Sequence, residues 1–301
     1  MASVSSVVLI GLARLKRNAD WQRLENWNWR EKLSFLSHGV TMEIQVTEPA
    51  AMVPVKLRLP PGWRSCKVSG DGPQYSLVVG NEVAPPGLDR LNLLFRGNAL
   101  ISAAYKLESV LGALESDLDH QVAMLAAPER IFVRAGVVGW HGRAIVIAGR
   151  PHSGTSTLVA ELLCAGASYY SDEYAVLDAQ GWVHPFARPL WLCAGAGPNP
   201  VRYRAEELGA RVATRAMPIG LVVFPRYRPG VRAQLAPLRP SAAAAELMDS
   251  IECAGTHPEA ARVATRKALA DAWILHGDRR EAKEIVPLLL GPRRHGQVGA
   301  G

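Results

Sequence analysis

The sequence has no apolar run long enough to cross a membrane. Its uninterrupted apolar stretches, such as Val7–Leu12, fall far short of the roughly 20 residues that a membrane-spanning helix needs. The first segment, Met1–Ala13, also has no positive charge ahead of its apolar stretch, because Arg14, Lys16 and Arg17 follow it. We therefore expect neither a membrane span nor a signal peptide, and we expect a cytoplasmic protein.

Cysteines are few and scattered. The 4 cysteines form no CxxC pair and have no histidine at zinc-binding spacing, so they predict neither a disulfide framework nor a metal site. The net charge of +7 comes mostly from arginine, but no basic run with interleaved aromatic residues is present. We therefore do not expect a nucleic-acid partner. The remaining composition, 49% hydrophobic and 20% charged, is that of an ordinary globular protein.

The first part of the chain predicts a sheet-rich lobe. Residues 1–30 show only weak periodicity and are interpreted as a leader, with no fold expected for them. Residues 31–128 are expected to form an N-terminal α+β lobe. Apolar and polar residues alternate there as in strands at three places: Met42–Val46, Pro54–Leu59 and Tyr75–Val79. A leucine stripe at helical spacing then predicts a helix near 104–126, closed by Pro128.

Residues 129–240 predict an α/β domain. Two β-branched apolar runs, Ile131–Trp140 and Arg143–Ala148, are separated by His141-Gly142, which favours a β-hairpin. A short helix is expected at Thr157–Ala165. Further strands are expected at Tyr174–Asp178 and Ile219–Phe224.

Residues 241–301 are expected to form a helical C-terminal segment. Three helices are predicted there: Ser241–Cys253, Pro258–His276 and Arg280–Leu290. The fold class expected for the whole chain is therefore α/β, with a sheet-rich N-terminal lobe, a central α/β domain and a helical tail.

The loop that joins the hairpin to the short helix carries the clearest motif. The phosphate-binding template requires a glycine, four residues, a second glycine, a lysine and then serine or threonine. Gly149, Gly154 and Ser156 match it, whereas Thr155 takes the place of the lysine. The glycines let backbone N–H groups and the helix N-terminus face an anion, and the serine would hold Mg²⁺. The sequence therefore predicts an anion cradle without the lysine's charge.

Two adjacent carboxylates, Asp172 and Glu173, follow this loop and precede a strand. Carboxylates in such a place bind Mg²⁺ and accept a proton from an attacking hydroxyl group. A solvated turn is the alternative interpretation for the pair. The phosphate-loop motif nearby in the chain favours the role as metal ligand and base.

Residues 131–192 resemble the HPr kinase family of bacterial serine kinases and their relatives. Four segments carry the resemblance: Ala135–Arg143, Gly149–Thr157, Tyr170–Tyr174 and His184–Leu190. Weaker similarity at Asp117–Val133 and Pro218–Gly230 extends it. The resemblance implies a P-loop fold similar to the kinase domain of phosphoenolpyruvate carboxykinase, with ATP and Mg²⁺ as cofactors. It also implies phosphorylation of a serine or another hydroxyl group.

The resemblance also implies roles for individual residues. The backbone of His152–Thr155 would cradle the phosphates, Ser156 would bind Mg²⁺, Asp172 would match the catalytic base, and Glu173 would match the neighbouring metal carboxylate. The full set of expected nucleotide-binding residues is Gly149, Arg150, His152, Ser153, Gly154, Thr155, Ser156 and Thr157.

Three positions depart from the family pattern. Thr155 replaces the lysine, Glu173 replaces a second aspartate, and Arg134 lies near where a histidine often precedes the glycine. The N-terminal lobe does not resemble that of HPr kinases, so their phosphocarrier substrate is not carried over.

Two functions therefore stay open. The first is an ATP- and Mg²⁺-dependent kinase, impaired by loss of the lysine, that acts on a hydroxyl of a peptide, protein or small molecule. The second is a non-catalytic pseudokinase that binds nucleotide or a partner as a regulatory or assembly module. Contacts with a second copy of the chain or with a partner protein are open as well.

Several basic residues are weaker candidates. His184 and Arg188 follow the acidic pair in a proline-bounded loop, where contact with phosphate or substrate and a structural role are about equally expected. Arg226 and Arg228 follow a strand and would clamp a phosphate. Arg150, inside the loop, would partly replace the missing lysine.

Overall fold

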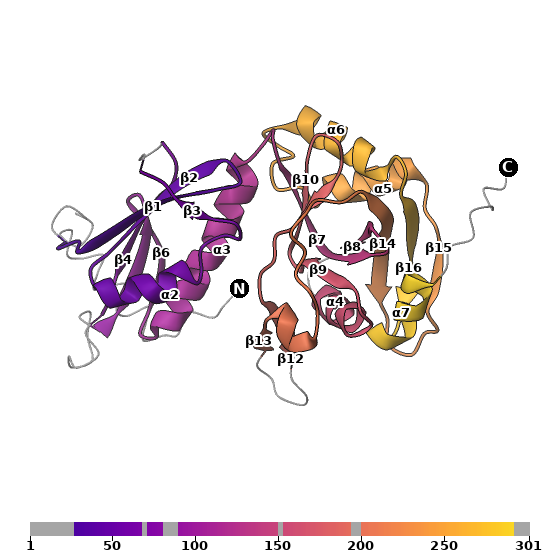
Figure 1. Ribbon diagram of the computed structural model, residues 1–301, viewed down its shortest axis with the longest axis horizontal. Coiled ribbons are helices and arrows are strands. Elements are labelled where there is room, and N and C mark those ends of the chain that lie inside the picture. The colour runs from indigo at the N-terminus through magenta and orange to yellow at the C-terminus, as the bar shows by residue number, and fades with distance from the viewer. Residues whose placement is uncertain (1–26, 68–70, 81–89, 150–152, 194–199, 292–301) are drawn as a thin grey trace. The chain divides into compact units, whose positions relative to one another are not determined.

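The computed structural model describes residues 27–67, 71–80, 90–149, 153–193 and 200–291 (Figure 1). Most of the predicted leader, residues 1–30, and the end of the chain beyond Gly291 lie outside the described residues. The chain divides into two compact units, Met1–Ala126 and Ala127–Gly301. The fold is mixed α/β, with three sheets and six α-helices among the described residues. No helix among them is long and apolar enough to cross a membrane.

The first unit is built on a six-stranded sheet with the strand order β3-β1-β2-β4-β5-β6. Its strands are β1 (Glu31–Ser37), β2 (Val40–Val46), β3 (Arg64–Ser65), β4 (Gln74–Val78), β5 (Asn92–Arg96) and β6 (Ala99–Ala104). The helix α3 (Leu107–Leu125) contacts β5 and β6 and buries Leu111, Leu114 and Leu118, three residues of the predicted leucine stripe. The expected helix near 104–126 and the strands expected at 42–46 and 75–79 are confirmed.

The strand predicted at Pro54–Leu59 is wrong. The chain there forms a short 3₁₀ turn, Pro49–Ala51, followed by the helix α2 (Met52–Lys56). A strand would place Val55 and Leu57 on one face, but Val55 is fully buried whereas Leu57 is 75% exposed. Burial of Met52 with Val55, three residues apart, is helical spacing.

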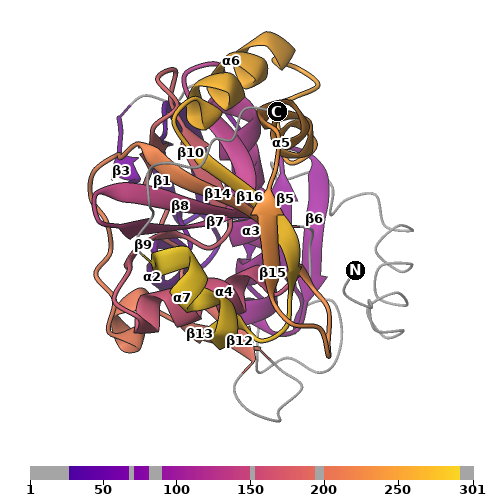
Figure 2. The ribbon, with the colours of Figure 1, turned by 90° about the vertical axis from the view of Figure 1, so that its right-hand side faces the viewer.

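The second unit is a sheet covered by helices on both faces, as Figure 2 shows. Its strand order is β11-β10-β7-β8-β14-β16-β15, and β9 also pairs with β7. The strands of this sheet are β7 (Ile131–Trp140), β8 (Arg143–Ala148), β9 (Ser168–Ser171), β10 (Tyr174–Leu177), β11 (Val183–His184), β14 (Ile219–Tyr227), β15 (Gln234–Pro237) and β16 (Trp273–Arg279). A separate hairpin is formed by β12 (Leu190–Cys193) and β13 (Pro200–Tyr203), and a 3₁₀ turn, Ala205–Leu208, follows it.

Alternation along the strands explains the two covered faces. On β8, Ile145 and Ile147 face one apolar cluster, which contains α4 (Thr155–Cys164) and α7 (Ala282–Leu290). The alternate residue Val146 faces the other cluster, which contains α5 (Pro240–Met248) and α6 (Pro258–Leu269). Successive strand residues point to opposite faces, so one apolar strand supplies both cores.

The predicted hairpin at the start of this unit is confirmed. β7 and β8 pair antiparallel, with Trp140 opposite Arg143. The two turn residues, His141 and Gly142, have φ of 47° and 74°, as a primed hairpin turn requires. The predicted helix at Thr157–Ala165 is also present, although α4 begins earlier, at Thr155.

The prediction that residues 241–301 form only helices is wrong. The helix predicted at Pro258–His276 ends at Leu269, and Trp273–Arg279 forms β16, which pairs in parallel with β14. Within β16, Gly277 has φ of +152°, and a Cβ there would lie 2.0 Å from the Gln234 carbonyl oxygen of β15, so the close pairing of β15 with β16 requires a glycine at this position. The segment therefore completes the sheet that carries the phosphate-loop motif.

Candidate functional site

The phosphate-loop segment, residues 149–157, joins the end of β8 to α4. β8, β14 and β16 run parallel, so the loop lies at the carboxyl edge of these strands. This edge is where open α/β sheets bind ligands. Two expected nucleotide-binding residues, Arg150 and His152, lie outside the described residues. Ser153 to Thr157 are described and can be placed.

Gly154 is the N-cap of α4 and adopts a left-handed conformation, with φ of 76°. Its carbonyl accepts the helical hydrogen bond from the Leu158 N–H at 3.1 Å, and no side chain caps the helix. The first N–H groups of an α-helix have no partner within the helix, and they carry the positive end of its dipole. The start of α4 therefore has the local geometry of an anion-binding turn.

Thr155, at the position of the template's lysine, offers no charge. Its hydroxyl lies 3.0 Å from the Ser153 hydroxyl, in hydrogen-bonding contact. Its methyl group packs against β7 at Gly136, where a Cβ would lie 2.8 Å from Thr155 Cγ2 and 2.6 Å from Val159 Cγ2. Helix α4 thus begins directly on the backbone of β7, and a glycine is required there.

The acidic pair lies in the short break between β9 and β10. Both strands pair with β7, and the Ala135 N–H donates to the Glu173 carbonyl at 3.1 Å. The break is held by Ser171, whose buried hydroxyl oxygen accepts the N–H groups of Glu173 at 3.1 Å and Tyr174 at 2.9 Å. The backbone thus fixes Asp172 across from the start of α4.

Asp172 and Ser156 meet at this point. The Ser156 hydroxyl lies close enough to the Asp172 carboxylate to influence the pKa of that group, while the Oδ1 atom of Asp172 is buried and has no hydrogen-bond partner among the described residues. Burial raises the pKa of Asp172 to about 7; the Ser156 hydroxyl lowers it and the charge of Glu173 raises it. A buried carboxylate oxygen without a protein partner is available to accept a hydrogen bond or to bind a cation.

Glu173 is exposed, whereas Asp172 is partly buried. Arg134, which stands near a family histidine position, pairs through Nε with Glu252 Oε1 at 2.5 Å and lies 5.4 Å from the centre of the Tyr174 ring.

The oxygen groups at this place suit Mg²⁺ bound together with phosphate and water better than a metal ion bound only by protein side chains. Among the residues that the structure describes, no group of three or more His, Cys, Asp or Glu side chains converges on one point. Mg²⁺ is commonly bound by one or two protein groups together with substrate phosphates and water. The Ser156 hydroxyl and the adjacent carboxylates of Asp172 and Glu173 are oxygen groups of this kind.

One cation at the loop escaped the sequence analysis. Arg279, the last residue of β16, is only 2% exposed. Its Nη2 donates to the carbonyl oxygens of Ser153 at 2.8 Å and Gly154 at 2.9 Å. Arg279 falls between the two predicted helices, Pro258–His276 and Arg280–Leu290, so the sequence prediction contains no strand that ends at this residue. The signal was a short apolar run, Trp273–Leu275, followed closely by Gly277.

The weaker candidates are engaged in local contacts. His184 Nε2 lies 2.8 Å from Asp178 Oδ2, within the β10–β11 hairpin. The Arg188 carbonyl accepts a hydrogen bond from the Tyr169 hydroxyl at 2.5 Å.

The two arginines at the end of β14, Arg226 within the strand and Arg228 just after it, also have an acidic neighbour. Arg226 and Arg228 each place Nε near the Asp278 carboxylate, at 3.3 and 3.5 Å, and both are largely exposed. They lie at the same sheet edge as the loop, since Arg226 pairs in register with Asp278 of β16.

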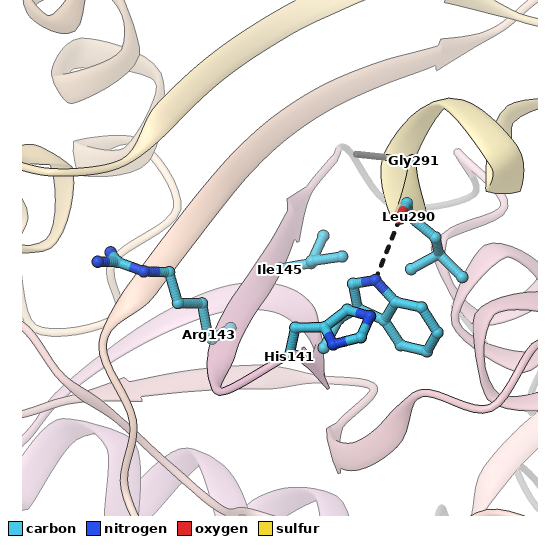
Figure 3. Close-up of a pocket in the computed structure, with 7 residues that line it drawn as sticks. His141, Arg143, Ile145, Leu290 and Gly291 are labelled. Atoms are coloured by element: carbon cyan, nitrogen blue, oxygen red, sulfur yellow. Dashed lines mark hydrogen bonds between the residues drawn. The ribbon is translucent and has the colours of Figure 1, made fainter. Parts of the chain in front are cut away.

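A cavity of about 410 Å³ lies at the other end of β8 (Figure 3). The cavity is lined by residues next to the β7–β8 turn and at the end of α7. The indole N–H of Trp140 donates a hydrogen bond to the Leu290 carbonyl at 3.1 Å. The lining residues of the cavity are Trp140, His141, Arg143, Ala144, Ile145, Leu290 and Gly291. The phosphate-loop segment lies at the carboxyl end of β8, whereas this cavity lies at the amino end of β8. The cavity is therefore separate from the phosphate-loop site.

Comparison with known proteins adds little. No protein-family model matches the chain, and no curated protein matches it. Among solved structures, an HPr(Ser) kinase/phosphatase from Coxiella burnetii matches with 16% sequence identity and a TM-score of 0.24. The match covers 36% of this chain and 71% of that one. A TM-score this low establishes neither a shared fold nor a shared activity, so the site rests on its own geometry.

Proposed function

We propose that the protein binds a nucleoside triphosphate and Mg²⁺ at the phosphate-loop segment and transfers a phosphoryl group to a hydroxyl. The observation that carries the proposal is the meeting of Ser156 with Asp172, whose Oδ1 is buried and unpartnered among the described residues. This pair lies at the start of a helix whose N-cap is a left-handed glycine. An anion cradle, a hydroxyl ligand and a carboxylate base are the parts that phosphoryl transfer needs.

Each part has one task. The N–H groups at the start of α4 would bind phosphate oxygens, and Ser156 and Glu173 would hold the metal. Bound Mg²⁺ supplies positive charge that neutralises the phosphate oxygens. The Asp172 carboxylate would take the proton of the acceptor hydroxyl as the acceptor oxygen bonds to the γ-phosphorus and the bond to the nucleoside diphosphate breaks. A base works best when its pKa lies near the working pH, and a pKa of about 7 meets this condition.

The second candidate is a non-catalytic nucleotide-binding protein. It is favoured by Thr155, whose hydroxyl contacts Ser153 where the template has a lysine. Removal of one preorganised donor from a site of developing charge costs about 10²–10³ in rate. The acceptor in the first candidate is the hydroxyl of a peptide, a protein or a small molecule, and the site does not distinguish these.

The test measures ATP turnover and binding in the same preparation. ADP release and label transfer from γ-labelled ATP are followed for the wild type, for Asp172→Asn, and for Asp271→Asn. Asp271 is a matched control because it is exposed and precedes β16, at the opposite edge of the sheet from the loop.

Mg²⁺-dependent turnover that Asp172→Asn abolishes and Asp271→Asn retains supports the kinase. Binding of ATP without turnover in any of the three proteins selects the non-catalytic candidate. Wild-type protein that binds no ATP at millimolar concentration contradicts both.

A further inference from the structure

Arg279 is a buried cation without a salt-bridge partner among the described residues. It lies at the end of β16, opposite Tyr227 of the neighbouring strand β14. The guanidinium carbon of Arg279 is 5.5 Å from the centre of the Tyr227 ring. The nearby acidic residue Asp278 pairs with other arginines, and the Nε of Arg279 is buried without a hydrogen-bond partner. Burial lowers the pKa of its guanidinium, and the charge of Glu281 opposes this only in part. A buried charge without a salt bridge is costly, and it calls for a compensating ligand or a local function.

The guanidinium is directed at the phosphate-loop backbone. Nη2 donates to the Ser153 and Gly154 carbonyls, and Nη1 donates to the Arg280 carbonyl at 3.1 Å. The contact is close, because a Cβ on Gly154 would lie 2.6 Å from Nη2. The second template glycine therefore has two reasons to be glycine: its positive φ and the arginine beside it.

These two hydrogen bonds orient the peptide groups of the loop. In a planar trans peptide the C=O and the N–H point in opposite directions. The Ser153 carbonyl shares its peptide plane with the Gly154 N–H, and the Gly154 carbonyl shares its plane with the Thr155 N–H. An arginine that holds both carbonyls therefore turns both N–H groups away from itself, toward the side where a phosphate would bind.

We propose that Arg279 is the positioning residue of this phosphate loop and supplies the local positive charge that Thr155 does not. It acts through the peptide groups of Ser153–Thr155 and not by touching the phosphate. The inference rests on the proposed function, because the oriented N–H groups need an anion to bind. The ligand class is a nucleoside di- or triphosphate or inorganic pyrophosphate, since a phosphate bound at this loop would offset the charge of Arg279.

The test compares Arg279→Met, Arg279→Lys and Arg280→Met with the wild type. Methionine keeps much of the side-chain volume but removes the charge and the donors, whereas lysine keeps the charge with a different donor geometry. Arg280 is the matched control, since it carries the same charge one residue later, is exposed and pairs with Glu284 of α7. Affinity for pyrophosphate and for Mg–ATP is measured by calorimetry, and folding by thermal unfolding.

We expect Arg279→Met to weaken pyrophosphate binding by roughly tenfold or more, the value of charge-assisted hydrogen bonds. Arg279→Lys should recover part of this loss, and Arg280→Met should bind as the wild type does. Wild-type affinity in a folded Arg279→Met overturns the proposal. Should Arg279→Met not fold, Arg279→Lys takes its place, and wild-type affinity in that variant overturns the proposal equally.

Hydrogen exchange separates this inference from the proposed function. The exchange rate of the peptide spanning 149–157 is measured without ligand in the wild type and in Arg279→Lys. Faster exchange confined to that peptide supports the positioning role even if the wild type binds no phosphate, a result that would sink the proposed function alone. Unchanged exchange there means that Arg279 does not hold the loop, and the inference fails.

Discussion

Replacement of Asp172 by asparagine should stabilise the protein above neutral pH while it removes phosphoryl transfer. The reason is the pKa of the carboxyl group, which burial raises from 3.8 to about 7. As the pH rises from about 4 to about 7, the unfolded chain releases this proton while the folded protein keeps it. Stability therefore falls across this window, and above it the full cost of the buried charge is present.

The structure sets the size of the effect. A difference of about three pKa units corresponds to about 4 kcal/mol, since each unit is about 1.4 kcal/mol. The new asparagine side chain would keep the shape of the aspartate, but its amide would need a hydrogen-bond partner in a buried place. We therefore expect Asp172→Asn to gain about 1–4 kcal/mol at pH 8 and little at pH 4.

The assay is thermal and urea unfolding of the wild type, Asp172→Asn and the control Asp271→Asn, each at pH 4, 6 and 8. The wild type should lose stability relative to Asp172→Asn as the pH rises, and Asp271→Asn should follow the wild type. A free-energy difference between wild type and Asp172→Asn that does not change with pH would refute the reasoning, because ionisation of the carboxylate would then carry no burial cost.

Three further substitutions test the loop. Gly154→Val should abolish detectable binding of Mg–ATP in calorimetry, because a β-branched residue at φ of 76° is strained and its Cβ would displace Arg279; retained affinity would show that the loop geometry does not matter. Thr155→Lys should tighten binding of ATP by about tenfold and of AMP by less, since an added ammonium reaches the terminal phosphates; equal gains for both nucleotides would contradict this. Gly136→Ala should lower the free energy of unfolding by about 1–3 kcal/mol, because the new methyl group would overpack against the first turn of α4. The control Gly112→Ala has open space around its Cβ and should be neutral or stabilising. Equal effects of the two substitutions on the free energy of unfolding would contradict the close packing at Gly136.

The secondary structure on either side of the loop could be predicted from the sequence, because its signals are local. The β7–β8 hairpin depends on two turn residues with positive φ, and α4 on a short apolar pattern after a glycine. Motif spacing assigns Ser156 and Asp172 to one site. Their roles in catalysis and metal binding stay predictions.

The parts that could not be predicted depend on long-range pairing. β16 is a short apolar strand whose partner, β14, lies some distance earlier in the chain, and a run such as Trp273–Leu275 is ambiguous between helix and strand. The same error concealed Arg279, which reaches the loop only because β16 runs parallel to β14 and β8. At Pro54–Leu59 an alternating pattern was overridden by helical burial of Val55.

The central claim is that the phosphate-loop segment binds the phosphates of a nucleotide. Calorimetric titration of the full chain with ATP, with and without Mg²⁺, tests it most directly, with Gly154→Val as the comparison. The account predicts saturable one-site binding that Mg²⁺ strengthens and that Gly154→Val lacks. Absence of binding by the wild type at millimolar ATP, or the same binding by Gly154→Val, would contradict it.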